Sequence, residues 1–190
     1  MKYILVDTLN MFFRAKHVGG GKDIDMRVGM AMHIMFNSIK KVWRDFEGDH
    51  VVMCLEGRSW RKDFYTPYKA NRKVKEQDLT EAEIEESEMF WETYQSLITF
   101  LSEKTNVTVL RDPNAEADDC IARFAALHPN DEHIIISTDT DYLQLLSESV
   151  HMYNGVNKQL ITIDGYFDDR GRPVIDKKTQ EHKTLEDPQY

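Results

Sequence analysis

Four short apolar runs along the chain each lead into one or more acidic residues. Because the runs are rich in β-branched residues, the pattern predicts buried strands of a parallel sheet. In an open parallel sheet the carboxyl ends of the strands share one edge, and ligands bind there. We therefore expect acids from distant parts of the sequence to form one cluster. The acids that follow the runs are Asp7, Glu56, Glu116, Asp118, Asp119, Asp139 and Asp141.

Strand and helix patterns alternate through most of the chain, which predicts an α/β fold with a mainly parallel sheet flanked by helices. The helix patterns have apolar residues at mixed spacings of three and four, and in one of them Ile84 and Trp91 are expected to face the core. The predicted strands are 2–7, 50–55, 106–110 and 133–137, with 149–153 and 159–163 as further candidates. The predicted helices are 26–46, 81–103, 116–127 and 140–147.

The segment 57–80 has no clean periodicity, and we interpret it as a long functional loop or as mobile short helices. Residues 58–75 carry seven basic side chains and one acid, whereas residues 76–92 carry eight acids and no base. Four aromatic residues lie among the charges. This mixture favours binding of phosphates and unpaired bases over a merely solvated charged loop.

The composition is that of a globular protein, with 41% hydrophobic and 30% charged residues in a chain of 190. This length suits one domain, or one domain with an appendage. The net charge of −9 argues against a nucleic-acid partner by itself, but the local basic segment keeps a phosphate-binding surface open. No apolar stretch approaches the roughly 20 residues that span a bilayer. Cys54 and Cys120 match no CxxC pattern, which favours buried thiols in a reducing cytoplasm.

Each acid taken alone has an ordinary alternative role. An acid before a helix is usually a cap, and both Glu116 and Asp139 precede predicted helices. The joint pattern is harder to explain in this way, because two carboxylates about 6 Å apart repel by roughly 3 kcal/mol at an effective dielectric of about 20. A cluster of such groups therefore requires cations.

Carboxylate oxygens are ligands that suit the hard cations Mg²⁺ and Mn²⁺. The seven histidines are scattered and neither cysteine lies near a second one, so the sequence offers no typical zinc spacing. The chemistry that the cluster implies is two-metal hydrolysis of a phosphodiester.

Four motifs that contain these acids and part of the basic segment occur in the order seen in one known family. On them the chain resembles the 5′-nucleases, the flap endonucleases and 5′–3′ exonucleases of phages and bacteria, over about residues 1–165. The resemblance implies a PIN-like (Rossmann-like) fold, a helical arch or loop insertion near 57–85, and Mg²⁺-dependent cleavage of DNA. The motifs are Val6-Asp7-Thr8-Leu9-Asn10 with Arg14, Tyr68-Lys69-Ala70-Asn71-Arg72, Glu116-Ala117-Asp118-Asp119 and Ser137-Thr138-Asp139-Thr140-Asp141.

Carried over residue by residue, the resemblance implies a site for two Mg²⁺ ions, for which Mn²⁺ substitutes. Glu56 stands where the family usually has Asp. Lys69 and Arg72 resemble cations that contact the scissile phosphate, Tyr68 resembles the aromatic residue beside them, and Arg14 resembles a basic residue that contacts substrate. The implied metal-site acids are Asp7, Glu56, Glu116, Asp118, Asp119, Asp139 and Asp141. The implied catalytic residues are Lys69, Arg72, Asp7, Asp118 and Asp139.

The end of the chain departs from the family pattern. Members of the family continue into a helix–hairpin–helix element that grips duplex DNA and adds two metal-site acids. Residues 165–190 are polar, contain no such motif, and are expected to be extended or weakly ordered. We expect a catalytic domain over 1–165 and a polar tail over 166–190 that leads toward a DNA-binding element absent from this chain.

The expected function is that of a 5′–3′ exonuclease or structure-specific flap endonuclease on DNA with 5′ ends, flaps or single-strand/duplex junctions. The expected location is the cytoplasm, that of the host if a phage encodes the chain. One alternative is a catalytically weak nucleic-acid-binding piece that needs a separate C-terminal polypeptide. Another is a PIN-type ribonuclease acting on RNA, although the long basic and aromatic segment argues against it.

Overall fold

A single sheet of seven strands organises the computed structural model, which describes residues 1–18, 24–69 and 80–185. The order across the sheet is β3-β2-β1-β4-β5-β6-β7, and neighbours from β3 to β5 pair in parallel, whereas β6 and β7 are antiparallel additions. The predicted α/β fold with a mainly parallel sheet is confirmed. The strands are β1 (Lys2–Asp7), β2 (His50–Cys54), β3 (Thr108–Leu110), β4 (Glu132–Ile136), β5 (Val150–Asn154), β6 (Gln159–Thr162) and β7 (Gly165–Asp168).

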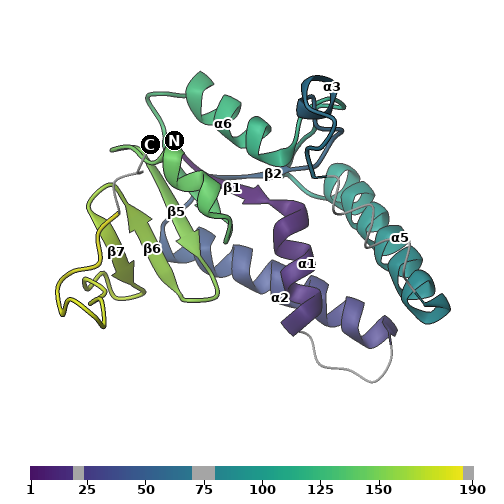
Figure 1. The fold of residues 1–190 in the computed structure, drawn as a ribbon, viewed down its shortest axis with the longest axis horizontal. Coiled ribbons are helices and arrows are strands. Elements are labelled where there is room, and N and C mark those ends of the chain that lie inside the picture. Colours follow the sequence, from purple (N-terminus) through teal and green to yellow (C-terminus); the bar gives the residue numbers. More distant parts are fainter. Residues whose placement is uncertain (19–23, 70–79, 186–190) are drawn as a thin grey trace.

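Helices cover both faces of the sheet, with α6 on one face and α1 and α2 on the other (Figure 1). The predicted helices 26–46, 81–103 and 116–127 are confirmed within a few residues, and α1 is a helix that the sequence pattern did not predict. The predicted helix 140–147 is instead a 3₁₀ helix, η1, which is tighter than an α-helix and suits short turns. The helices are α1 (Thr8–Val18), α2 (Ile24–Asp45), α3 (Arg61–Phe64), α5 (Glu81–Lys104), α6 (Ala117–Leu127) and η1 (Thr140–Leu145).

The core lies in two layers, because successive side chains of a strand point to opposite faces. Ile4 and Val6 of β1 pack with α1, α2 and α5, whereas Leu5 packs with α6 and η1. All three are fully buried, as expected for the middle strand of the parallel part of the sheet. Ile84 and Trp91 of α5 are 45% and 42% exposed, so their predicted place in the core is wrong. The buried residues of α5 in this core are Phe90, Tyr94, Leu97 and Leu101.

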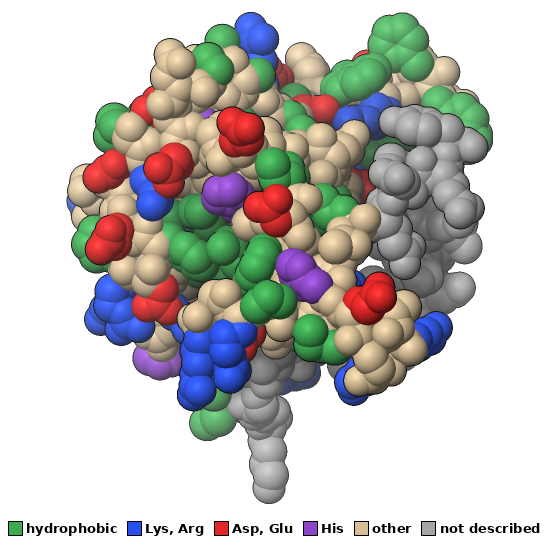
Figure 2. Space-filling view, turned by 90° about the vertical axis from the view of Figure 1, so that its left-hand side faces the viewer, with side chains coloured by type: hydrophobic (Ala, Val, Ile, Leu, Met, Phe, Trp, Pro, Cys, Tyr) green, Lys and Arg blue, Asp and Glu red, His purple; other side chains and the backbone are tan. Residues whose placement is uncertain are grey.

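The polar stretch after residue 165 is more ordered than its composition predicted. β7 extends the sheet to Asp168, and the chain then folds back along it, with Val174 donating to the carbonyl of Tyr166 and Tyr166 to that of Lys183. Backbone hydrogen bonding supplies this order where apolar burial is sparse. Figure 2 shows the face on this side of the molecule, where acidic and basic side chains are interspersed rather than gathered by sign.

No helix in residues 1–18, 24–69 and 80–185 is both long and apolar enough to cross a bilayer.

Candidate active site

Strand register brings the predicted acids together. Asp7 at the end of β1 pairs with Cys54 of β2, and Val6 pairs with Ile136 of β4. Glu56 and Asp139 follow these partners by two and three residues, so both emerge at the same edge as Asp7. This edge is where the carboxyl ends of parallel strands form a ligand-binding crevice.

A cavity of about 380 Å³ opens at this edge. Five of the seven predicted acids line it, together with two of the predicted cations, Arg14 and Lys69. Asp119 and Asp141 do not line it; Asp141 is exposed, and its backbone N–H donates to Asp139. The cavity is formed by Asp7, Leu9, Asn10, Phe13, Arg14, Glu56, Lys69, Glu116, Asp118, Asp139 and Tyr142.

Asp7 is held at the floor of the cavity by neutral donors. Its Oδ2 accepts hydrogen bonds from the hydroxyls of Ser137 at 3.2 Å and Tyr142 at 3.1 Å, and its Oδ1 accepts from the backbone N–H of Asn10 at 3.3 Å. Burial nevertheless raises the pKa of Asp7 to about 6, because these hydrogen bonds only partly offset the loss of hydration. Among the described residues, the groups that hydrogen-bond to this carboxylate are all neutral, and no basic side chain forms an ion pair with it.

Glu56 and Asp118 are in a similar electrostatic position. The Oε2 atom of Glu56 accepts from the backbone N–H of Ala117 at 3.1 Å. Burial raises the pKa of both carboxyl groups, and the nearby acids raise it further. Three side chains of this cavity thus carry negative charge that the protein solvates poorly, which is the condition that a bound cation relieves.

Glu116 differs because donors surround it. Lys69 donates to its Oε1, while Ser59 at 2.9 Å, Arg61 at 3.0 Å and Tyr68 at 2.9 Å all donate to its Oε2. Burial alone would raise the pKa of Glu116, but the hydrogen bonds from Lys69, Tyr68 and Ser59 together lower it. Glu116 therefore stays ionised although it is only 5% exposed.

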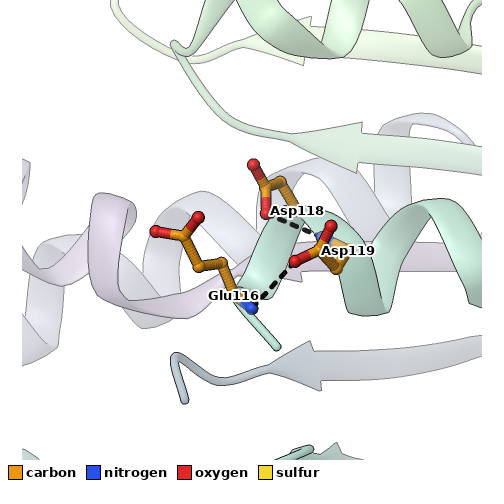
Figure 3. Close-up of side chains that lie close together, drawn as sticks. All are labelled: Glu116, Asp118 and Asp119. Carbon is orange, nitrogen blue, oxygen red and sulfur yellow. Dashed lines mark hydrogen bonds between the residues drawn. The ribbon is translucent and has the colours of Figure 1, made fainter. Parts of the chain in front are cut away.

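The start of α6 gathers three acids (Figure 3), and one oxygen from each of Glu116, Asp118 and Asp119 lies within 4.8 Å of the others. The Oδ2 atom of Asp119 accepts from the backbone N–H of Glu116 at 3.1 Å, which closes the first turn of the helix. Asp139 likewise caps η1 by accepting from the N–H of Asp141. The capping alternatives for these acids are therefore real, and they coexist with the cavity.

A divalent cation fits the residues of the cavity. The donors at hand are carboxylate oxygens, and the described residues of its wall include no histidine or cysteine. Such a set suits a hard cation rather than zinc. Two basic side chains, Arg14 and Lys69, also line the cavity. An anionic group that approaches a bound metal ion would therefore meet positive charge from the protein as well.

Sequence reasoning assigned no role to several residues of this site. Ser137 and Tyr142 hold Asp7, while Ser59 and Arg61 hold Glu116. Arg61 was one of seven basic residues in its segment, and only its contacts separate it from the others. Predicted Arg72 lies in 70–79, outside the described residues, and so does this middle part of the arch predicted near 57–85.

A model of the family "5′-3′ exonuclease, N-terminal resolvase-like domain" matches residues 2–171. The chain belongs to this family. Among known proteins, the chain is 29% identical over 167 residues to flap endonuclease Xni of Shewanella loihica, covering 86% of this chain and 59% of that protein. It is 24% identical over 170 residues to a 5′-3′ exonuclease of Mycoplasmopsis pulmonis, covering 87% of this chain and 52% of that protein. The chain thus spans less than two thirds of these relatives.

Solved structures share the fold of this 5′-3′ exonuclease family domain. The T5 5′-exonuclease with bound divalent zinc ions superposes with a TM-score of 0.72 at 23% identity, over 86% of this chain and 58% of that one. The flap endonuclease of bacteriophage T5, in a complex with DNA and metal ions, superposes with a TM-score of 0.69 at 23% identity, over 86% and 58% of the two chains. The PIN-like fold expected from the sequence is confirmed.

Proposed function

We propose that this chain is the catalytic portion of a divalent-metal-dependent 5′-nuclease that hydrolyses phosphodiesters of DNA. The observation that carries the proposal is the cavity at the strand ends, where five carboxylates face Lys69 and Arg14. Poorly solvated carboxylates call for cations, and the two basic side chains call for an anionic substrate. Family membership favours DNA as that substrate.

The five acids that line the cavity would hold Mg²⁺, in two sites, with Mn²⁺ as a substitute: Asp7, Glu56, Glu116, Asp118 and Asp139. The bound metal would supply an activated water and stabilise charge on the attacking and leaving oxygens of the phosphate. The raised pKa of Asp7 supports this assignment, because an ion beside it would offset the cost of its burial.

The remaining residues orient the acids and the substrate. Ser137 and Tyr142 fix the direction in which Asp7 presents its oxygens. Lys69 and Arg14, which both line the cavity, would bind the non-bridging oxygens of the scissile phosphate. Lys69 has a backbone φ of 54°, in the left-handed region, which is uncommon for a lysine and is found preferentially at functional sites.

The substrate proposed is DNA with a 5′ end, a flap or a single-strand/duplex junction. Relatives named as flap endonucleases and the T5 complex with DNA support it. A basic and aromatic segment beside the cavity, including Trp60, Phe64 and Tyr65 as exposed rings, is suited to unpaired bases. The chain spans 59% of its Shewanella relative, so the proposal covers the single-stranded part of the substrate and names no residue that binds the duplex.

The test compares two acids that are two positions apart in sequence. Asp139 lines the cavity and Asp141 does not. With a 5′-flap DNA substrate and Mg²⁺, we expect Asp139→Asn to lose at least about a hundredfold in cleavage rate, as for removal of a group that stabilises the transition state. Asp141→Asn should lose less than about tenfold. Equal activity of wild type and Asp139→Asn would contradict the proposal. If wild type cleaved a matched RNA flap faster than the DNA flap, the proposed substrate would be RNA instead of DNA.

A further inference from the structure

Arg61, the first residue of α3, binds two acids at the start of α6. Its Nη1 and Nη2 atoms donate to the two carboxylate oxygens of Asp119 at 2.8 and 2.9 Å. The same Nη1 also donates to Oε2 of Glu116 at 3.0 Å. A planar guanidinium that uses two N–H groups on one carboxylate fixes the orientation of that carboxylate, which a lysine ammonium does not do.

Aromatic rings hold the guanidinium of Arg61 in place. Its central carbon lies 5.0 Å from the ring centre of Trp60 and 5.8 Å from that of Tyr68. The side chain of Arg61 is 30% exposed, against 23% for Asp119 and 7% for Glu116. The cluster is therefore partly desolvated, and the side chain of Arg61 has less conformational freedom than it would have in a surface ion pair.

Asp118 and Asp119 are neighbours with different surroundings. Asp118 lines the cavity, and within the described part of the chain it accepts a hydrogen bond from the backbone N–H of Asp119 at 2.7 Å. Asp119 lies outside the cavity lining, and an ion pair already compensates its charge. Arg61 binds the carboxylate of Asp119 directly, so a divalent cation there would meet the guanidinium at contact distance, whereas Arg61 acts on Asp118 only through a weaker through-space attraction.

We infer that Arg61 and Asp119 form a positioning pair that sets Glu116 and the first turn of α6 against the cavity, while Asp118 is the metal ligand of the two adjacent acids. The inference rests on the proposed metal site and assigns this pair no contact with substrate. Removing the guanidinium would leave Asp119 without its ion pair beside Glu116, which would keep Lys69, and the unpaired carboxylate of Asp119 would then move away from Glu116. A partner that orients a ligand in this way typically changes metal affinity by about 10–100-fold.

The test measures binding of Mn²⁺ alone, by electron paramagnetic resonance on the full chain without nucleic acid. Arg61→Gln should weaken binding about tenfold or more, and Arg61→Lys should weaken it less. Asp118→Asn should weaken binding more than Asp119→Asn. Because both members of the pair act through one contact, Arg61→Gln combined with Asp119→Asn should be no worse than about twofold beyond Arg61→Gln.

Arg58→Gln is the matched control, since Arg58 pairs with Asp63 and its side chain is 63% exposed. It should leave the Mn²⁺ affinity unchanged. Thermal unfolding of each variant without metal identifies any that do not fold. If Arg61→Gln does not fold, the single variants Asp119→Asn and Arg61→Lys are compared with wild type instead. Mn²⁺ affinity of Arg61→Gln within twofold of wild type would overturn the inference, as would Asp119→Asn binding more weakly than Asp118→Asn.

Cleavage provides a separate readout. Raising the Mn²⁺ concentration about tenfold should restore the flap-cleavage rate of Arg61→Gln, because the ligands themselves remain. A plateau that stays at least tenfold below wild type at saturating Mn²⁺ would contradict a positioning role. A wild-type chain that binds Mn²⁺ but cleaves no DNA or RNA substrate would contradict the proposed nuclease and leave the metal-binding comparison to decide the role of Arg61.

Discussion

The hydroxyl of Tyr142 donates a hydrogen bond to Oδ2 of Asp7 at 3.1 Å, across 135 positions of sequence. Both groups are buried, with Tyr142 2% and Asp7 6% exposed. The bond joins η1 to the end of β1 at the floor of the cavity. Tyr142 thus has a double role, since its ring fills the core beneath α6 while its hydroxyl supports a candidate metal-site acid.

Tyr142→Phe should therefore keep the packing and lose one buried hydrogen bond. We expect the free energy of unfolding, measured by urea denaturation, to fall by about 0.5–1.5 kcal/mol. Tyr3→Phe is the control, because within the described residues the hydroxyl of Tyr3 makes an exposed contact of 3.4 Å with the sulfur of Met1. A control loss as large as that of Tyr142→Phe would show that the hydroxyl of Tyr142 contributes nothing specific.

Mg²⁺ should stabilise the folded chain. Burial raises the pKa of Asp7 and Asp118, two of the acids in the cavity. An ion that binds only the folded state increases the free energy of unfolding by mass action. At a free Mg²⁺ concentration 100 times the dissociation constant, the gain is about 2.7 kcal/mol. Thermal unfolding with Mg²⁺ and with a chelator measures it, and an unchanged midpoint would argue against a metal site.

Asp118→Asn should separate stability from function. Burial raises the pKa of Asp118, which means that folding disfavours its ionised form at neutral pH. The neutral amide removes this cost, so without metal we expect a gain of about 0.5–2 kcal/mol in the free energy of unfolding. The same variant should lose most of the Mg²⁺-dependent gain. Denaturation at pH 7 with and without Mg²⁺ tests both effects, and a less stable metal-free variant would be the opposite result.

Gly57 is required where two loops of the site meet. A Cβ atom added there would lie 2.0 Å from the carbonyl oxygen of Asp112 and 2.6 Å from that of Ala115. Gly57→Ala should therefore cost about 1–3 kcal/mol and displace Glu56 or Glu116. Gly29 of α2 has open space around it, so Gly29→Ala should stabilise the helix by up to about 1 kcal/mol. Denaturant unfolding of both variants checks the contrast.

Acid should destabilise the chain through His133. This imidazole is fully buried on β4, neither ring nitrogen has a hydrogen-bond partner in the described chain, and Tyr3 stacks on it at 5.8 Å. Burial lowers the pKa of His133 below its usual 6.5, so the unfolded chain takes up a proton before the folded chain does. The contribution to stability is complete above about pH 6.5 and is lost as the pH falls below it.

Denaturation of wild type and His133→Phe between pH 5 and 8 measures this effect. The stability of wild type relative to the variant should decline below about pH 6.5, by at most about 1.4 kcal/mol per pH unit. Burial raises the pKa of Asp7, so this group makes the free energy of unfolding depend on pH with the opposite sign. Because wild type and His133→Phe both contain Asp7, its contribution cancels in the difference between them. Exposed His33, replaced by Gln, serves as the control. A pH-independent difference would contradict the role of His133.

The parallel strands were predictable because their apolar runs are continuous and their acids follow directly. α1 was not predicted, although Met11, Phe12 and Ala15 are buried there. The apolar pattern of α1 is too short to predict a helix by itself, and its apolar residues become buried only because the helix packs on α2. The order around β7 was also missed, because it comes from backbone hydrogen bonds between residues such as Tyr166 and Lys183 rather than from a hydrophobic pattern.

The sequence by itself determined that carboxylates would gather at one sheet edge, since each acid follows a strand and parallel strands end together. Only the tertiary structure decided which of them line the cavity. The sequence pattern places the adjacent acids Asp118 and Asp119 in the same candidate metal site, but the position of α3 places Arg61 on Asp119 across 58 residues. The physical reason is that strand patterns are local, whereas the charge state and orientation of a side chain depend on neighbours that the folded chain brings from elsewhere.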